Sequence, residues 1–145
     1  MPDEICVPVV REEGVELPTY ETDGAAGMDV RLAENLALAP GERTLARTGL
    51  RLAIPPGFEA QVRPRSGLAL RHGITMLNSP GTIDSDFRGE LGLIVINLGQ
   101  DFVQLDKGTR VAQLVFAPVT RAIWQPVDHL ETTPRGSGGF GSTGN

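Results

Sequence analysis

Apolar and polar residues alternate along much of the chain, which is the pattern of half-buried β-strands. In the stretch LRLAI, residues 50–54, Leu50, Leu52 and Ile54 occupy every second position. The stretch FEAQVR, residues 58–63, repeats this alternation. The run LGLIVINL, residues 91–98, is apolar on both faces and predicts a strand that is covered on both sides. The chain is therefore expected to consist mainly of short strands.

Turn signals separate these runs at Pro40-Gly41, Pro55-Pro56-Gly57, Ser79-Pro80-Gly81 and Asp106-Lys107-Gly108. Only SGLALRHG, residues 66–73, has the composition of a helix, with Ser66 as the expected N-cap and Gly73 as the stop. We expect an all-β fold, a jelly-roll-like β-barrel or sandwich with one short helix. The domain is expected to span residues 1–133, and residues 134–145 to form a flexible, Gly-rich C-terminal arm.

Composition narrows the classes of partner. The 145 residues include 18 glycines and 11 prolines, which together make up 20% of the chain. The average share of these two residues is roughly 12%, so the composition favours many turns. A net charge of −5 argues against a nucleic-acid polymer as partner. One cysteine excludes an intramolecular disulfide and fits a reducing compartment. With no membrane-spanning apolar run and no signal-peptide pattern, the chain is expected to be soluble, cytoplasmic and free of membrane.

Five segments combine glycines, arginines and isolated polar residues in a way that strands alone do not explain. They are AGMDV with Asp29, PRSGLAL with Arg65, Ser66 and Gly67, NSPGTIDSDFRGELG (residues 78–92) with Asp84, RVAQLVF with Gln113, and the tail PRGSGGFGSTGN (residues 134–145). Four of the segments also have a simpler interpretation: a Ser cap at the helix start, a turn that explains Asp86 better than Asp84, a buried amide or an edge position at Gln113, or a frayed terminus. The tail also matches G-x-G-x-x-G, but no helix can follow it, so a dinucleotide site is excluded.

Together and in this order, the five segments resemble the five motifs of the homotrimeric dUTP diphosphatases (dUTPases). The resemblance covers residues 25–144, and PRSG and RGSGGFGSTG are its most specific parts. It implies hydrolysis of dUTP to dUMP and pyrophosphate with Mg²⁺, in a homotrimer whose active sites lie between subunits. Such an activity keeps uracil out of DNA and supplies dUMP for thymidylate synthesis.

The resemblance also implies roles for individual residues. Asp84 matches the catalytic aspartate that activates a water for attack on the α-phosphorus. Asp29 and Gln113 match positions that hold the water shell of Mg²⁺, while the ion itself is held by phosphates and water. Arg65, Ser66 and Gly67 match a phosphate site. The expected substrate contacts are Arg65, Ser66, Gly67, Asn78, Thr82, Ile83, Asp84, Phe87, Gly92, Gln113, Arg135, Phe140, Gly141, Ser142 and Thr143.

The 78–92 segment is expected to be a hairpin that reads uracil through Asn78 and main-chain groups. Phe87 is a departure, because the family more often has tyrosine there; its ring is expected to pack on the deoxyribose. In the tail, Phe140 is expected to stack over uracil, while Arg135, Ser142 and Thr143 wrap the β- and γ-phosphates. The arm would then be a lid that orders only over substrate.

Two other functions stay open. The related dCTP deaminases share this fold but need an added acid/base glutamate, and Glu90, the only glutamate in the 78–92 segment, is interpreted as a solvated strand residue. A non-catalytic binding or regulatory protein on the same fold is the second alternative.

Overall fold

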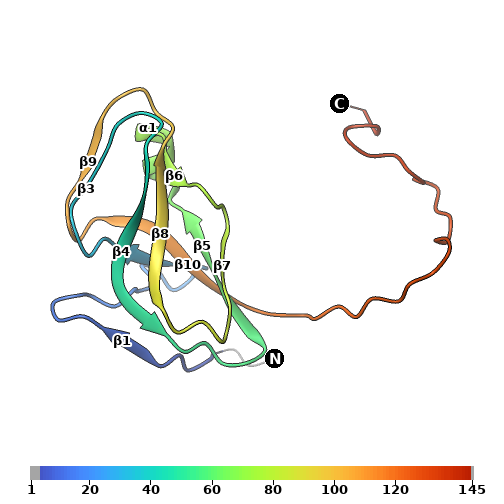
Figure 1. Cartoon of the computed structure of the whole chain (residues 1–145), viewed down its shortest axis with the longest axis horizontal. Helices are drawn as coiled ribbons and strands as arrows, with labels where there is room; N and C mark the ends of the chain where they lie inside the picture. Colours follow the sequence, from blue (N-terminus) through green and yellow to red (C-terminus); the bar gives the residue numbers. More distant parts are fainter. Residues whose placement is uncertain (1–3, 145) are drawn as a thin grey trace.

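Two four-stranded antiparallel sheets form the body of the protein in the computed structural model, which describes residues 4–144 (Figure 1). One sheet has the order β1 (Val9–Arg11), β4 (Arg43–Leu52), β8 (Glu90–Asn97) and β6 (Ile74–Met76). The other has the order β2 (Met28–Arg31), β10 (Arg110–Pro118), β5 (Phe58–Pro64) and β7 (Gly81–Ile83). A two-stranded ribbon of β3 (Leu36–Leu38) and β9 (Val103–Leu105) completes a jelly-roll-like sandwich.

The core lies between the sheets and follows the alternation in the sequence. Leu50 and Ile54 are almost fully buried, as are Ala60 and Val62 in β5. The half-buried strand predicted at 58–63 is confirmed, whereas at 50–54 the burial alternates as predicted but β4 ends at Leu52. One face of each strand therefore packs inward, and the residues between remain available for other contacts.

Strand β8 departs from its prediction. Leu91, Leu93 and Val95 are buried at 2% exposure or less, but Gly92 and Ile94 on the opposite face are only partly covered. Next to them on β4, Leu45 is 65% exposed. Ile96, at the end of the same face of β8, is 8% exposed. Within the described residues of one chain, the outer face of β8 is therefore covered only at this end, and the prediction of two covered faces holds in part.

The single helix, α1 (Ser66–His72), ends as expected and begins differently. Gly73 is the C-cap in the left-handed region, with φ of 68°. A Cβ there would lie 2.5 Å from the Gly99 amide nitrogen, so a side chain is excluded. Ser66 as N-cap is wrong: Arg65 occupies that position in an extended conformation, and no side chain caps the helix. The Ser66 hydroxyl is therefore not committed to a cap.

The hairpin expected at 78–92 is also wrong as a paired structure. Strand β7 pairs with β5, placing Gly81 opposite Val62. Strand β8 belongs to the other sheet, because β4 and β6 occupy its two edges. The segment therefore crosses from one sheet to the other, with a turn in which the Phe87 amide donates to the Asp84 carbonyl.

The C-terminal arm leaves the body at the end of β10 and runs away from it (Figure 1). From residue 119 to 144 there is no strand or helix, so the extended segment begins before the expected boundary at 134. Ile123 and Trp124 are 95% and 91% exposed. These large apolar side chains contact little of their own chain.

Candidate active site

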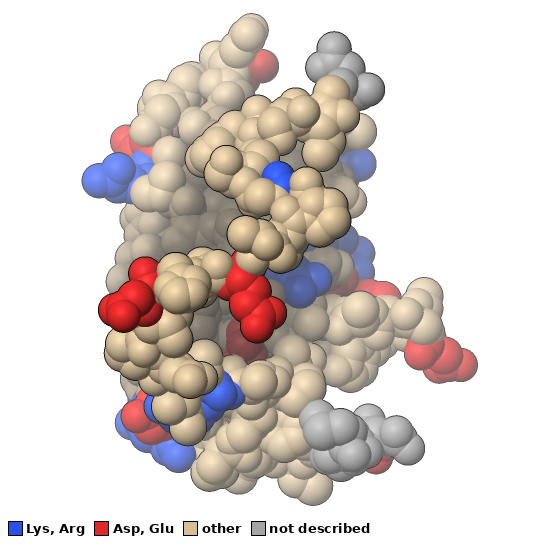
Figure 2. All heavy atoms as spheres, turned by 90° about the vertical axis from the view of Figure 1, so that its right-hand side faces the viewer, with Lys and Arg blue, Asp and Glu red and all other residues tan. Residues whose placement is uncertain are grey.

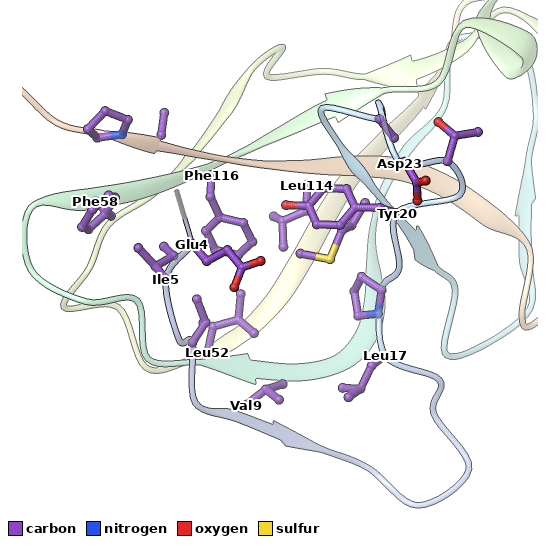
Figure 3. A pocket seen from close by; sticks show the side chains of 17 residues that line it. Glu4, Ile5, Val9, Leu17, Tyr20, Asp23, Leu52, Phe58, Leu114 and Phe116 are labelled. Atoms are coloured by element: carbon purple, nitrogen blue, oxygen red, sulfur yellow. The ribbon is translucent and has the colours of Figure 1, made fainter. Parts of the chain in front are cut away.

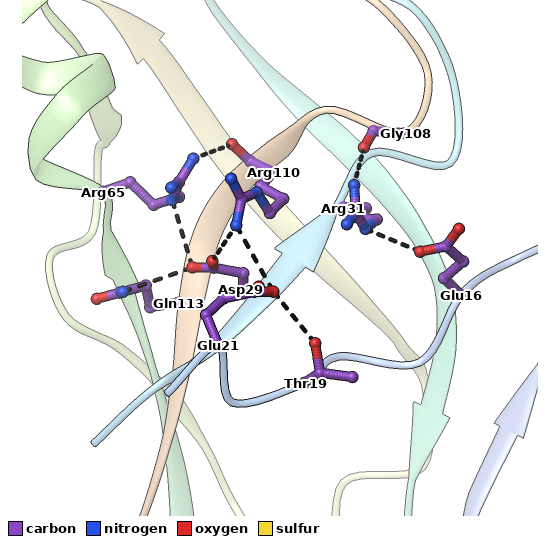
Figure 4. Close-up of polar contacts among 9 residues, drawn as sticks. All are labelled: Glu16, Thr19, Glu21, Asp29, Arg31, Arg65, Gly108, Arg110 and Gln113. Carbon is purple, nitrogen blue, oxygen red and sulfur yellow. Dashed lines mark hydrogen bonds and ion pairs between the residues drawn. The ribbon is translucent and has the colours of Figure 1, made fainter. Parts of the chain in front are cut away.

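A nearly buried carboxylate, Asp29, lies at the centre of a polar cluster (Figure 4). Its side chain is only 7% exposed, which is unusual for a charged residue. Arg65 Nε is 3.3 Å from Oδ1, and Arg110 Nη1 is 3.2 Å from Oδ2. Gln113 Nε2 donates to Oδ1 at 3.5 Å. Two cations and an amide thus compensate the desolvation of this buried charge.

A β-bulge explains how strand β10 supplies both Arg110 and Gln113 to this cluster. Residues three apart on a regular strand point to opposite faces. The register against β2 shifts between Arg110 and Ala112, and Gln113 then stands directly opposite Asp29. The inserted residue reverses the alternation, so Arg110 and Gln113 reach the same carboxylate.

Arg65 links this cluster to the start of α1. Besides its ion pair with Asp29, its Nη1 donates to the Arg110 carbonyl at 3.0 Å. Its side chain is 28% exposed, so the guanidinium is fixed but reachable. Ser66 and Gly67 follow at once, and a Cβ at Gly67 would come within 3.0 Å of Arg71 Nη2. The structure therefore brings together Asp29, Arg65 and Gln113, with Ser66 and Gly67 adjacent in the chain.

Asp84 stands immediately after β7 and is exposed to solvent. Its carbonyl accepts from the Phe87 amide, and Arg88 Nη1 donates to the carbonyls of Ser85 and Phe87. Strand β7 runs antiparallel to β5, with Gly81 opposite Val62 and Ile83 opposite Ala60. Asp84 therefore follows the end of β7 that lies farther from Arg65, about 20 Å away along an extended strand. Within one chain the Asp84 carboxylate is thus held on an ordered turn that is separate from the Asp29 cluster.

The remaining residues of the 78–92 segment surround this turn. Asn78 is exposed, and its amide lies against Gly81, where a Cβ would be 3.2 Å from Nδ2. Thr82 and Ile83 are the last residues of β7. Phe87 is 45% exposed and lies on Gly89. Gly92 lies in β8, which belongs to the other sheet from β7, and it stands opposite Arg47 of the neighbouring strand β4.

The tail residues lie apart from all of these in a single chain (Figure 1). Arg135 Nε donates to the Gly138 carbonyl, so the glycine-rich segment forms local turns. Phe140 is fully exposed and has a positive φ of 53°, which is uncommon for a residue with a side chain. A Cβ at Gly138 would lie 2.7 Å from Ser142 Oγ. These local turns do not bring Phe140, Gly141, Ser142 or Thr143 to the body.

Glu90 is bound to an arginine rather than solvated. Arg47 Nε and Nη2 donate to its two carboxylate oxygens at 3.2 and 2.7 Å, and Glu12 binds the same guanidinium. The hydrogen bonds with Glu90, and then those with Glu12, raise the pKa of Arg47 above its already high ordinary value. Arg47 therefore stays protonated, and Glu90 remains paired.

An open groove of about 960 Å³ lies on another part of the body, beside the N-terminal segment (Figure 3). Its lining is mainly apolar and includes Ile5, Tyr20, Leu114 and Phe116. None of the residues of the Asp29 cluster or the Asp84 turn lines it. The groove is therefore separate from the candidate active site.

Charge is mixed on the face that carries the arm, where blue and red side chains are interspersed outside the grey residues (Figure 2). No broad basic surface is visible there, as the acidic net charge leads one to expect. Among the residues that the structure describes, no helix is long and apolar enough to cross a membrane.

Comparison with known proteins shows the family to which the chain belongs. The family model described as dUTPase matches residues 13–144, nearly the whole chain. The chain belongs to the dUTPase family. It is 58% identical over 146 residues to the deoxyuridine 5'-triphosphate nucleotidohydrolase of Anaeromyxobacter sp. (strain Fw109-5), covering 99% of both chains. It is 53% identical to the enzyme of the same name from Sinorhizobium medicae, covering 99% of this chain and 92% of that one.

Solved structures of the family share the fold. The dUTPase of Staphylococcus bacteriophage 80alpha with dUpNHpp superposes with a TM-score of 0.89 at 24% identity, over 97% of this chain and 99% of that one. A mutant dUTPase from phage phi11 of S. aureus gives a TM-score of 0.80 at 22% identity, over 88% of this chain and 100% of that one. The structure of that mutant shows the coordination of a structural Mg(II) ion. At this identity the likeness establishes the jelly-roll-like sandwich that the sequence predicted.

Sequence reasoning missed one member of the cluster, Arg110. It opens RVAQLVF, three residues before Gln113. Under strict alternation that spacing puts the two on opposite faces. The bulge that overrides this leaves no clear signal in the sequence.

Proposed function

We propose that the protein hydrolyses dUTP to dUMP and pyrophosphate, with Asp84 as the base that activates water for attack on the α-phosphorus. The observation that carries this proposal is the match of the chain to the dUTPase family over residues 13–144, with an exposed carboxylate, Asp84, on an ordered turn. A carboxylate is ionised at neutral pH and can accept the proton of a water. In a cell this reaction would keep uracil out of DNA and supply dUMP, and we expect it in the cytoplasm.

Arg65, Ser66 and Gly67 would bind phosphate near the scissile bond. Arg65 is held by Asp29 and by the Arg110 carbonyl, so its orientation needs little ordering when the anion arrives. Because no side-chain cap occupies it, the Ser66 hydroxyl can donate to a phosphate oxygen. Together they would stabilise charge on the phosphoryl oxygens.

The donor set fits Mg²⁺ that is held mainly by phosphates and water. Among the described residues there is no group of three or more His, Cys, Asp or Glu side chains able to hold a metal, and Mg²⁺ typically uses few protein ligands. Asp29 and Gln113 would orient water around it. When bound, the ion would offset the negative charge of the triphosphate.

The 78–92 segment would form the pyrimidine pocket. The Asn78 side chain, with main-chain groups of Thr82, Ile83 and Gly92, would read the uracil edge. Such hydrogen-bonded reading can discriminate by about 10⁴-fold, because a wrong base leaves buried groups unpaired. Phe87 would pack on the deoxyribose and exclude a ribose 2′-hydroxyl.

The arm would be a lid donated to another subunit of a homotrimer. Its direction away from its own body and the exposure of Ile123, Trp124 and Leu130 support this assignment. So does the partly covered outer face of β8, because large exposed apolar surfaces mark interfaces. Phe140 would stack on uracil, while Arg135, Gly141, Ser142 and Thr143 would contact the β- and γ-phosphates.

The bidentate ion pair of Glu90 argues against the deaminase alternative. A deaminase needs a glutamate free to exchange protons in the pocket, whereas both oxygens of Glu90 are bound to Arg47. Release of ammonia from dCTP would nevertheless reverse this assignment.

The test is pyrophosphate release with Mg²⁺ from dUTP, UTP, dTTP and dCTP in parallel, with ammonia measured as well. We expect release from dUTP alone. Asp84→Asn should lower kcat by about 10²- to 10⁴-fold, the usual contribution of a general base. Asp86→Asn is the matched control, since Asp86 is also exposed and lies in the same turn. Equal loss in both variants would refute the role of Asp84, and no turnover of any nucleotide would favour a regulatory protein.

A further inference from the structure

Arg110 has no role in the function proposed above, yet both its side chain and its main chain bind members of the Asp29 cluster (Figure 4). Its Nη1 lies 3.2 Å from Asp29 Oδ2 and 3.6 Å from Glu21 Oε1. Its main-chain carbonyl accepts from Arg65 Nη1 at 3.0 Å. Arg110 thus touches Arg65 directly through its main chain, and indirectly through the carboxylate that both arginines share.

The two oxygens of Asp29 are divided between the two arginines. Oδ2 is held by Arg110, which leaves Oδ1 for Arg65 Nε and Gln113 Nε2. A carboxylate with one free oxygen can rotate and offer either oxygen, or both, to the remaining guanidinium. The contact of Arg110 with Oδ2 therefore fixes the orientation in which Asp29 presents Oδ1 to Arg65.

The charges in the cluster also indicate that Arg110 acts on Arg65 through Asp29. Asp29 is 7% exposed and carries one negative charge between two guanidinium groups. With Arg110 in place, that charge is shared, and Arg65 keeps positive potential for an incoming anion. Without Arg110, Asp29 would neutralise Arg65 alone, and the site would lose one unit of positive charge.

We propose that Arg110 is a positioning residue, which holds the Asp29 carboxylate so that Arg65 is presented to the substrate phosphate. The inference rests on the proposed role of Arg65 in binding phosphate. It adds a fourth residue to the anion site and places its action one contact away from the ligand.

Arg31 provides a matched control on the paired strand. It stands opposite Arg110 in the β2–β10 register, and each side chain is 38% exposed. Arg31 also makes an ion pair, with Glu16 at 3.1 Å, and its Nη1 donates to the Gly108 carbonyl. It contacts neither Asp29 nor Arg65 through its side chain (Figure 4).

The experiment compares Arg110→Gln, Arg110→Lys and Arg31→Gln in the full-length protein, measuring kcat and KM for dUTP and the Kd of dUpNHpp. Arg110→Gln should lower kcat/KM by about 10- to 100-fold, the range expected when a hydrogen bond to a charged group is lost. It should also weaken dUpNHpp binding. Arg110→Lys should recover most of the loss, because lysine restores a cation beside Asp29. Arg31→Gln should stay within about twofold of the unmodified protein, as a surface ion pair implies.

A double variant separates positioning from any independent role. If Arg110 acts through Arg65, then Arg65→Gln/Arg110→Gln should be no more than about threefold worse than Arg65→Gln alone. Multiplication of the two losses, or an Arg110→Gln variant that behaves like Arg31→Gln, would overturn the inference. An Arg65→Gln variant with full activity would instead refute the phosphate role of Arg65 and, with it, this inference. Thermal unfolding of each variant checks the fold. Arg110→Met, which keeps the length of the side chain without its charge, carries the test if Arg110→Gln does not fold.

Discussion

Discrimination against ribose should depend on Gly89, on which the Phe87 ring lies. An ideal Cβ at residue 89 would be 2.6 Å from Phe87 Cζ and 2.9 Å from Cε1, whereas ordinary carbon contacts are about 3.5–4.0 Å. The backbone at Gly89 is not in the left-handed region, so alanine is sterically allowed apart from this contact. Gly89→Ala must therefore displace the ring by about 1 Å.

A displacement of this size can cost up to about 100-fold when geometry is critical. Because Phe87 is 45% exposed and free to relax outward, we expect a smaller effect, about a tenfold fall in the ratio of kcat/KM for dUTP to that for UTP. The assay is pyrophosphate release from each nucleotide. Stability should change little, since residue 89 is exposed.

Gly24→Ala is the control, because a Cβ there meets nothing within 4 Å. Phe87→Ala separates the two parts of the reasoning. If Phe87→Ala lowers the dUTP/UTP ratio and Gly89→Ala does not, then Gly89 does not place the ring. If Phe87→Ala leaves the ratio unchanged, Phe87 is not the sugar check.

Two further outcomes concern stability and the arm. The buried Thr48 hydroxyl donates to the Leu91 carbonyl at 2.6 Å and accepts from the Leu50 amide at 3.2 Å, so Thr48→Val should lower the free energy of unfolding by about 2–4 kcal/mol. In urea titrations Thr44→Val should stay within about 0.5 kcal/mol, as expected for a residue without such bonds; an equal loss would contradict the assignment. A chain that stops at Thr133 should keep its unfolding midpoint but bind dUpNHpp about 10- to 100-fold more weakly; unchanged binding would refute the lid.

The strands of this protein were predictable because their information is local. Alternation at 50–54 and 58–63 depends only on which residues face a core, and the structure buries Leu50, Ile54, Ala60 and Val62 as expected. The stop of α1 at Gly73 was equally local, since a left-handed C-cap favours glycine whatever surrounds it. Features fixed by one or two neighbours in the chain were therefore recovered.

Pairing partners were less predictable, because they depend on competition between distant segments. A turn was expected from sequence at Asp86, and one forms at residues 84–87. The hairpin does not form, since β7 pairs with β5 and both edges of β8 are occupied. Glu90 was misjudged for the same reason. Its arginine partner, Arg47, comes from β4, 43 residues earlier in the chain. No local sequence pattern predicts that contact.

Arg110 shows why a site can be hidden even when the strand that carries it is recognised. In a regular strand, the parity of the spacing decides which face a residue occupies, so Arg110 and Gln113 should diverge. A single inserted residue reverses that parity, and its effect is to place a cation and an amide around one carboxylate. A site assembled in this way depends on a backbone irregularity as much as on its side chains, and motif spacing alone does not locate its members.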